Sequence, residues 1–218
     1  MRTRGPTLIV VLASICCGPA CDRRERPVLA REVDLETAGR LVREEIFRDN
    51  PRMNPDAVFP IEEITTDEVR RDLGLQVFKV TEKATVQQDE TFVVRDGRAR
   101  RIARGIGGKG VTSMVPADLD GDGRKELVFS FSWGSGRHRS EVGALIEGQG
   151  GLMERNAGRS FFDEDVTVRG ADGAAGVYRG DLLLGVLVLE RGELRLRPAE
   201  GLPADALPPD RRGGLDRG

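Results

Sequence analysis

Four carboxylates alternate with other residues along one short segment near the middle of the chain. The run DLDGDGRKE, residues 118–126, has aspartates at its first, third and fifth positions and a glutamate at its ninth. A calcium ion takes six to eight oxygens at about 2.3 to 2.6 Å, so alternate carboxylates on a tightly turned loop suit it. The run therefore predicts a Ca²⁺ site. The expected ligands are side-chain oxygens of Asp118, Asp120 and Asp122, the backbone carbonyl of Arg124, and Glu126, directly or through water.

The residues that follow decide which kind of calcium loop this is. Gly123 stands at the sixth position, where the chain turns sharply and a side chain would clash. The twelfth position is Phe129, not the glutamate of a helix-loop-helix calcium hand, and the sequence continues as the strand-like LVFSFSW. The stretch ADLDGDGRKELVF resembles the FG-GAP and VCBS repeats of integrin-alpha-like propeller blades, in which such a loop joins two strands. Extracellular calcium modules typically bind with Kd of about 0.1 to 1 mM, so millimolar calcium would contribute on the order of 1 kcal/mol, and we expect a structural brace, not a switch.

Two considerations limit this interpretation. Asp and Gly also favour turns for purely conformational reasons, so a turn that binds no metal is the alternative. The loop occurs once in the chain. Propellers typically contain four to eight blades, so we expect a single blade-like unit and not a complete propeller.

A second segment, WGSGRHRS at residues 133–140, contains the single tryptophan and the single histidine of the chain. Because these residues are concentrated close to the metal loop in the sequence, the segment is a candidate ligand site. His138 can donate or accept a hydrogen bond, and Arg137 and Arg139 can pair with an anion. The alternative is a glycine-hinged turn, in which Trp133 fills the core and the basic side chains are solvated or balance the acids of the loop.

The N-terminus has the layout of a secretory signal peptide. Two arginines precede the apolar run LIVVLASI at residues 8–15, and CCGPAC follows it. We assign residues 1–20 to the signal peptide and residues 21–33 to a charged tether. The three cysteines lie in or beside this leader, so the body of the chain has no thiol for a disulfide or a thiolate metal site.

The cysteine at the end of the leader suggests that the protein is attached to a membrane. Cys21, preceded by Ala20, resembles the modified cysteine of bacterial lipoproteins, which implies a membrane partner reached through a lipid anchor. Two alternatives remain: Cys16 as the modified residue, or ordinary cleavage after Ala20. The runs GIGGKGVTSM, DLDGDGRKEL and SWGSGRHRS are also similar to a segment of predicted bacterial lipoproteins, notably of planctomycete type. That likeness implies no particular activity.

Charge and motifs leave three hypotheses for function. The chain has 34 basic and 36 acidic side chains, and removal of residues 1–20 takes away two arginines, so nothing indicates a nucleic-acid partner. The first hypothesis is a non-enzymatic envelope module that recognises an envelope protein or a glycan. The second is a hydrolase that uses His138 or the bound metal, and the third is a purely structural lipoprotein.

Periodicity predicts an α+β fold that is mainly antiparallel β, as a single domain over residues 34–198. Asp34 should cap a first helix that ends before Pro51, and Thr66 a second helix closed by Gly74. The dipeptides Asp96-Gly97 and Arg191-Gly192 predict tight hairpins. We expect an antiparallel sheet of about eight short strands, with one or two N-terminal helices packed on it. Residues 199–218 should form a disordered tail. The expected strands are residues 75–80, 91–94, 114–117, 127–132, 142–146, 166–168, 182–190 and 193–197.

Overall fold

The computed structural model describes residues 32–211 apart from residues 53, 55–58, 84–86, 135, 172 and 204. The predicted signal peptide, the lipidation of Cys21 and the tether up to residue 31 lie outside the described residues. No helix in the described part of the chain has the length and apolarity that are needed to cross a membrane.

Both predicted helices are present, and their caps explain their bounds. Asp34 precedes α1 (Leu35–Asp49), and its side chain accepts a hydrogen bond from a backbone N–H of the first turn at 2.7 Å. Thr66 caps α2 (Asp67–Leu73) in the same way, and Gly74 ends α2 in the left-handed conformation at φ 61°. The helical predictions are therefore confirmed at both ends.

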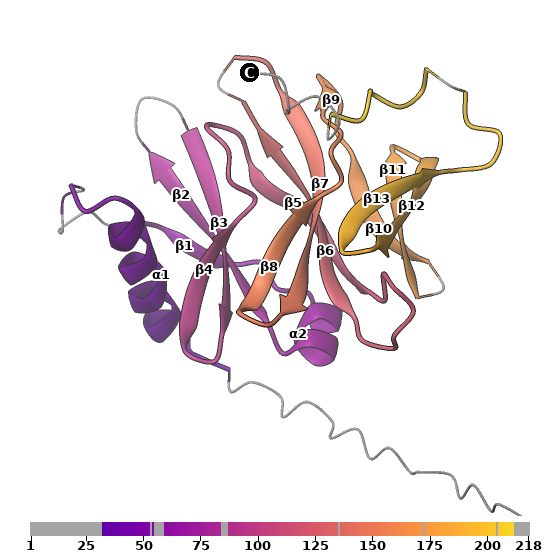
Figure 1. Ribbon diagram of the computed structural model, residues 1–218. Coiled ribbons are helices and arrows are strands. Elements are labelled where there is room, and N and C mark those ends of the chain that lie inside the picture. The colour runs from indigo at the N-terminus through magenta and orange to yellow at the C-terminus, as the bar shows by residue number, and fades with distance from the viewer. Residues whose placement is uncertain are drawn as a thin grey trace, which may run out of the picture.

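The described strands form three antiparallel sheets, and each sheet is a meander in chain order (Figure 1). The first sheet contains β1 (Ile61–Glu63), β2 (Gln76–Lys83), β3 (Gln87–Arg95) and β4 (Arg98–Ile102). The middle sheet contains β5 (Gly110–Ala117), β6 (Glu126–Trp133), β7 (Arg139–Gly148) and β8 (Gly151–Asn156), with β9 (Phe161–Phe162) paired to β7. The last sheet contains β10 (Thr167–Ala171), β11 (Ala174–Arg179), β12 (Leu182–Glu190) and β13 (Glu193–Pro198).

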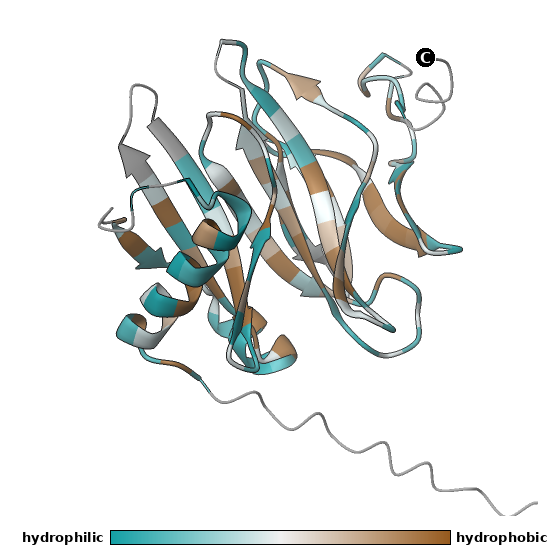
Figure 2. Cartoon of the chain, turned by 60° about the vertical axis from the view of Figure 1, so that its left-hand side comes forward, coloured by the Kyte–Doolittle hydropathy of each residue, from teal (hydrophilic) through white to brown (hydrophobic). Residues whose placement is uncertain are grey.

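The sheets stack face to face, with α1 outside the first sheet (Figure 1). Because side chains alternate between the two faces of a strand, the middle sheet can bury both faces. On β6, Leu127, Phe129 and Phe131 enter the core shared with the first sheet, while Val128 enters the core shared with the last sheet. A third core lies between α1 and the first sheet. Figure 2 shows the resulting apolar bands along the strands.

Two hairpins have the tight turns that the sequence predicts. Arg95 pairs with Arg98 and Glu190 pairs with Glu193, so each turn contains two residues. Both residues of each turn have positive φ, between 52° and 79°, as the type I′ turn requires.

The broad α+β, mainly antiparallel prediction is confirmed, but the expected strand number and the single sheet are wrong. The described residues contain thirteen strands in three sheets, and the sheets do not close into a barrel. Five strands have no counterpart in the expected ranges. β1 and β9 contain only three and two residues, and β8 and β11, with the sequences GLMERN and AAGVYR, show no clear apolar alternation. β4 follows the predicted Asp96-Gly97 turn, although its residues are absent from the expected ranges.

The C-terminal segment also differs from the expected disordered tail over its described part. Leu202 and Leu207 pack against the core between the middle and last sheets. The backbone N–H of Arg211 donates to the carbonyl of Gly158 at 2.8 Å. These contacts hold the segment along the two sheets up to residue 211, and residues 212–218 lie outside the described residues.

Candidate functional site

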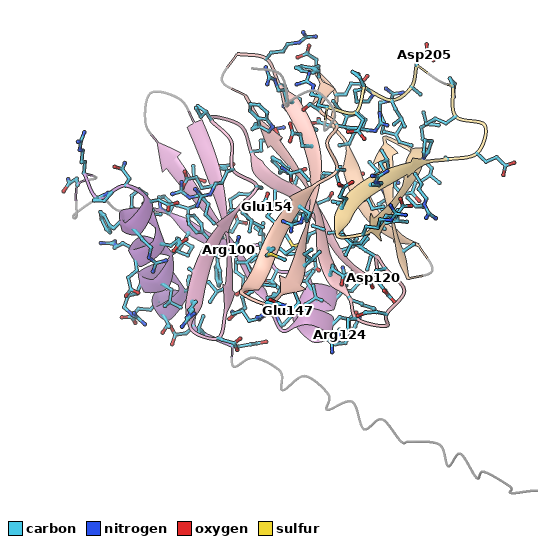
Figure 3. All side chains as sticks on the ribbon, in the orientation of Figure 1. Arg100, Asp120, Arg124, Glu147, Glu154 and Asp205 are labelled. Carbon is cyan, nitrogen blue, oxygen red and sulfur yellow. The ribbon has the colours of Figure 1, made fainter. Side chains whose placement is uncertain are left out.

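The aspartate loop connects β5 to β6 at one end of the middle sheet, so it lies between two strands as the sequence predicts (Figures 1 and 3). Asp118, Asp120 and Asp122 each place a carboxylate oxygen within 4.8 Å of the other two. Asp118 is partly buried, and the other two are exposed. Three hard oxygen ligands thus converge on one point that solvent can reach, which suits a divalent cation.

Backbone amides of the loop fix the orientation of its carboxylates. The two oxygens of Asp118 accept from the N–H groups of Gly121 and Gly123 at 2.7 and 2.9 Å. Oδ1 of Asp120 and Oδ1 of Asp122 each accept from the amide two residues ahead, at 3.1 and 2.7 Å. Gly121 and Gly123 have φ of 78° and 85°, which glycine adopts at no steric cost. The loop therefore turns around its own side chains.

Glu126 lies apart from the three aspartates. The residue is 9% exposed, and its carboxylate accepts a hydrogen bond from the backbone N–H of Leu119 at 2.9 Å. Burial, and secondarily the negative charges of the aspartates, raise its pKa to about 7, although the hydrogen bond opposes the shift. Glu126 thus closes the base of the loop, and a metal in the loop would favour its ionised form.

Arg124 occupies the seventh position of the loop, where its backbone carbonyl is the expected ligand. Its backbone N–H donates to Asp122, and its side chain lies near the carboxylate of Glu147 on β7 (Figure 3). The hydrogen-bonded guanidinium of Arg95, and secondarily the charge of Arg124, lower the pKa of Glu147.

The loop is attached to two neighbouring parts of the fold, and the sequence does not indicate either attachment. The N–H of Asp118 donates to the carbonyl of Gly173 at 3.2 Å, and the carbonyl of Leu119 accepts from the N–H of Leu189 at 2.8 Å. Both partners belong to the last sheet or its turns. Lys125 Nζ forms an ion pair with Asp72 of α2 at 2.8 Å. The loop therefore connects the middle sheet to the last sheet and to α2.

The second candidate group follows the metal loop closely in the sequence but lies away from it in the structure. Its residues are Trp133, Arg137, His138 and Arg139. Glu126 begins β6 and Trp133 ends it, so about seven steps of roughly 3.3 Å, some 23 Å in all, separate the two features. The sequence places the groups seven residues apart, but an extended strand carries them to opposite ends of the sheet. Any ligand at this second group is remote from the loop.

His138 lies in a hydrogen-bonded chain with serine and aspartate side chains. Its Nδ1 is 3.1 Å from the hydroxyl of Ser132, and its Nε2 is 2.8 Å from Oδ1 of Asp165 and 3.3 Å from the hydroxyl of Ser140. These are the residue types of a hydrolytic triad. However, Ser132 and Ser140 are each only 2% exposed, so neither hydroxyl is placed to attack a substrate.

The arginines of this group gather around an aromatic ring that the sequence does not single out. Arg139 of β7 pairs with Trp133 of β6 on one side and with Phe162 of β9 on the other side. Its guanidinium lies 4.6 Å from the first ring centroid and 4.9 Å from the second. Arg137 and Arg211 also lie over Phe162, at 5.0 and 4.9 Å. The consecutive phenylalanines at residues 161–162 are the only sequence signal for this ring.

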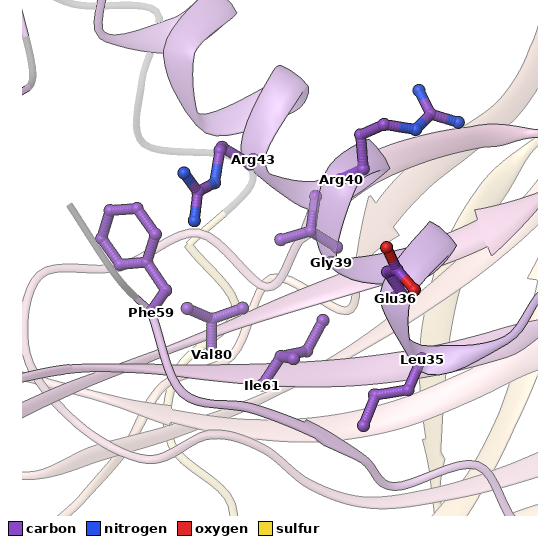
Figure 4. A pocket seen from close by; sticks show the side chains of 9 residues that line it. Leu35, Glu36, Gly39, Arg40, Arg43, Phe59, Ile61 and Val80 are labelled. Atoms are coloured by element: carbon purple, nitrogen blue, oxygen red, sulfur yellow. The ribbon is translucent and has the colours of Figure 1, made fainter. Parts of the chain in front are cut away.

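A groove of about 390 Å³ lies on the other side of the first sheet, along α1 (Figure 4). Its floor contains Ile61 and Val80, and its rim contains Glu36, Arg40 and Arg43. It contains none of the predicted site residues.

Comparison of the chain with known proteins yields no match to a family model, to a curated protein or to a solved structure.

Proposed function

We propose that the protein is an exported envelope protein, held at the membrane by a lipid anchor on Cys21, whose domain is braced by one calcium ion. Its role is recognition or structural support, with an envelope protein or a glycan as partner. The observation that carries the calcium proposal is the convergence of three aspartate oxygens within 4.8 Å on an accessible loop. The FG-GAP and VCBS resemblance of ADLDGDGRKELVF supports the same assignment.

Electrostatics favour a cation at this point. Carboxylates a few ångströms apart at a protein surface repel one another by on the order of 1 kcal/mol or more per pair. A divalent cation reverses this repulsion. Extracellular calcium modules typically bind with Kd of about 0.1 to 1 mM, so millimolar calcium stabilises such a fold by on the order of 1 kcal/mol. That magnitude suits a brace.

The attachments of the loop support this role. Asp118 and Leu119 are hydrogen-bonded to the last sheet, and Leu119, which is 4% exposed, enters the core between the middle and last sheets. Lys125 reaches α2 from the same loop. A cation that fixes the loop would therefore hold three parts of the fold in register.

The hydrolase alternative receives less support. It requires a nucleophile or a metal-bound water beside His138, but the serines that contact His138 are buried and the aspartate loop is at the far end of β6. We therefore propose a module without catalytic activity.

Calorimetric titration of the mature chain, from residue 22, with calcium tests the metal site. We expect binding near millimolar concentration, and at least about tenfold weaker binding in Asp120→Asn. The matched control is Asp96→Asn, because Asp96 lies in an Asp-Gly turn that has no acidic cluster and asparagine tolerates its positive φ. No heat at several millimolar calcium, or equal binding by Asp120→Asn, would contradict the proposal.

Fractionation of producing cells tests the anchor. The full chain should sediment with membranes and carry acyl mass, and Cys21→Ser should release it into the soluble fraction. Cys16→Ser serves as the control and should leave the protein on the membrane. Release by Cys16→Ser alone would move the anchor to that residue, and release by neither change would remove the lipid anchor from the proposal.

A further inference from the structure

Three guanidinium groups converge on the ring of Phe162, at the end of the middle sheet remote from the aspartate loop. We call Arg137, Arg139, Arg211 and Phe162 the Phe162 cluster. Each guanidinium carbon is within 5.0 Å of the same ring centroid, so any two of them are at most about 10 Å apart. Like charges at such separations repel, so an anion bound among them would relieve this repulsion.

The hydrogen-bond donors of Arg139 have no acceptor within residues 32–211 as far as the structure describes them. Strand register places it between Trp133 and Phe162, and the two rings lie against its guanidinium at 4.6 and 4.9 Å. A guanidinium carries its N–H groups in its plane, so aromatic contacts leave those groups available. Among the described residues, no carboxylate forms a salt bridge with Arg139 and no acceptor receives a hydrogen bond from it.

The other two arginines extend the same surface. The side chain of Arg211 also has no ion pair within the described part of the chain, and its backbone is held by the carbonyl of Gly158 at 2.8 Å. Arg137 uses Nε to bind Asp163 at 2.7 Å, which leaves its terminal nitrogens. Both Arg137 and Arg211 are exposed.

The carboxylates around the cluster already have partners. Asp163 binds Arg137, Asp165 binds His138, and Glu141 accepts from the hydroxyl of Ser160. Within the described part of the chain, none of these three carboxylates forms a salt bridge with Arg139 or Arg211.

We propose that the Phe162 cluster binds a tetrahedral oxyanion, namely a phosphate or sulfate group, either as the free ion or as a monoester. Charge-assisted N–H···O bonds of about 2.7 to 2.9 Å to one such group place two guanidinium carbons roughly 8 Å apart, which is within the limit set by Phe162. Arginine forks match phosphate geometry, and the aromatic contacts hold Arg139 before the ligand arrives. This site gives the proposed recognition module a ligand class, and its residues lie outside both the aspartate loop and the proposed anchor.

The single tryptophan reports on this site directly, because Arg139 lies on its ring. We would titrate the mature chain with inorganic phosphate, inorganic sulfate and O-phosphoserine, and follow Trp133 emission at constant ionic strength. Sodium acetate and sodium chloride are the controls for charge and salt. Saturable changes with the tetrahedral anions alone are expected. Binding of the inorganic ions indicates that the site recognises the phosphate or sulfate group itself. Tighter binding of O-phosphoserine indicates additional contacts to the serine part of the ligand. Both results support the proposal.

Variants provide the decisive comparison. Arg139→Gln and Arg211→Gln should each weaken phosphate binding by at least about tenfold, since each removes charge-assisted hydrogen bonds. Arg211 is on the exposed C-terminal segment, so its variant keeps the fold even if Arg139→Gln lowers the melting temperature. The matched control is Arg169→Gln, because Arg169 also lies over an aromatic ring, that of Tyr178 at 4.8 Å, but on the last sheet. Equal responses to phosphate and acetate, or unchanged affinity in Arg211→Gln and Arg139→Gln, would overturn the proposal.

Discussion

Replacing Glu126 with glutamine should stabilise the calcium-free protein at neutral and alkaline pH. Burial and the neighbouring aspartates raise the pKa of Glu126 from its ordinary 4.5 to about 7. The folded protein therefore holds the proton more tightly than the unfolded chain, and wild-type stability decreases as pH rises from about 4.5 to 7. Each pKa unit corresponds to about 1.4 kcal/mol, so ionised Glu126 costs on the order of 3 kcal/mol at pH 8. Glu126→Gln keeps an acceptor for the N–H of Leu119 and removes that cost.

The assay is urea unfolding of both proteins with a chelator present, at pH 5 and at pH 8. The variant should gain little at pH 5, where the folded wild type is mostly protonated at Glu126, and should gain most at pH 8. In millimolar calcium the advantage should shrink, because the cation favours the ionised carboxylate that the variant lacks.

A second buried glutamate supplies the control. Burial raises the pKa of Glu154, which accepts from the N–H of Ala103 at 3.2 Å, but its environment contains Arg100 and Arg104 and lies between the first and middle sheets, away from the loop (Figure 3). Glu154→Gln should therefore respond to pH in the same direction and be insensitive to calcium. The reasoning is refuted if Glu126→Gln is less stable than wild type at pH 8 in chelator, or if both variants lose their advantage equally in calcium.

Two further predictions concern the frame that holds these sites. Phe129→Ala should lower the free energy of unfolding by about 3 to 5 kcal/mol, because the fully buried ring fills the core between the first and middle sheets. The control is Leu182→Ala, at an exposed position, which should change stability by less than about 0.5 kcal/mol in the same urea experiment. Gly108→Ala should cost at least about 1 kcal/mol, because φ is 97° and an added Cβ would lie 2.5 Å from the backbone of Ser132 and Trp133. Gly150→Ala meets nothing within 4 Å and should be nearly neutral, so comparable thermal shifts in the two glycine variants would contradict the argument.

Local signals in the sequence predicted local structure well. Asp34 and Thr66 cap the helices by bonding their own first turns, and the turns at residues 96–97 and 191–192 depend on the conformations of two residues each. Such features are determined within a few positions of the chain. The alternating aspartates are equally local, and the structure brings all three together.

Features that depend on contacts between distant parts of the chain could not be predicted from the sequence in this way. β8 has the sequence GLMERN. Its first five residues are partly buried and its last residue is exposed, so neither an apolar alternation nor a run of apolar residues marks it as a strand. Phe162 becomes significant only because β9 pairs with β7 and places its ring opposite Arg139. Arg211 reaches that ring from the C-terminal segment, whose Pro, Gly and charge content indicates disorder. Composition describes what a segment can form alone, but here a neighbouring sheet supplies the contacts.

The two arginines of the Phe162 cluster that form no salt bridge among the described residues, Arg139 and Arg211, are held in place by different parts of the fold. Arg139 is fixed by strand pairing on both sides, so its position depends only on the middle sheet. Arg211 depends on the C-terminal segment, where Leu202 and Leu207 pack against the core that also contains Leu119 of the loop. A cation that tightened the contact between the middle and last sheets would therefore support Arg211 through a shared core, whereas strand pairing holds Arg139 independently of it. Calcium would therefore act on the anion site through Arg211, which the C-terminal segment carries.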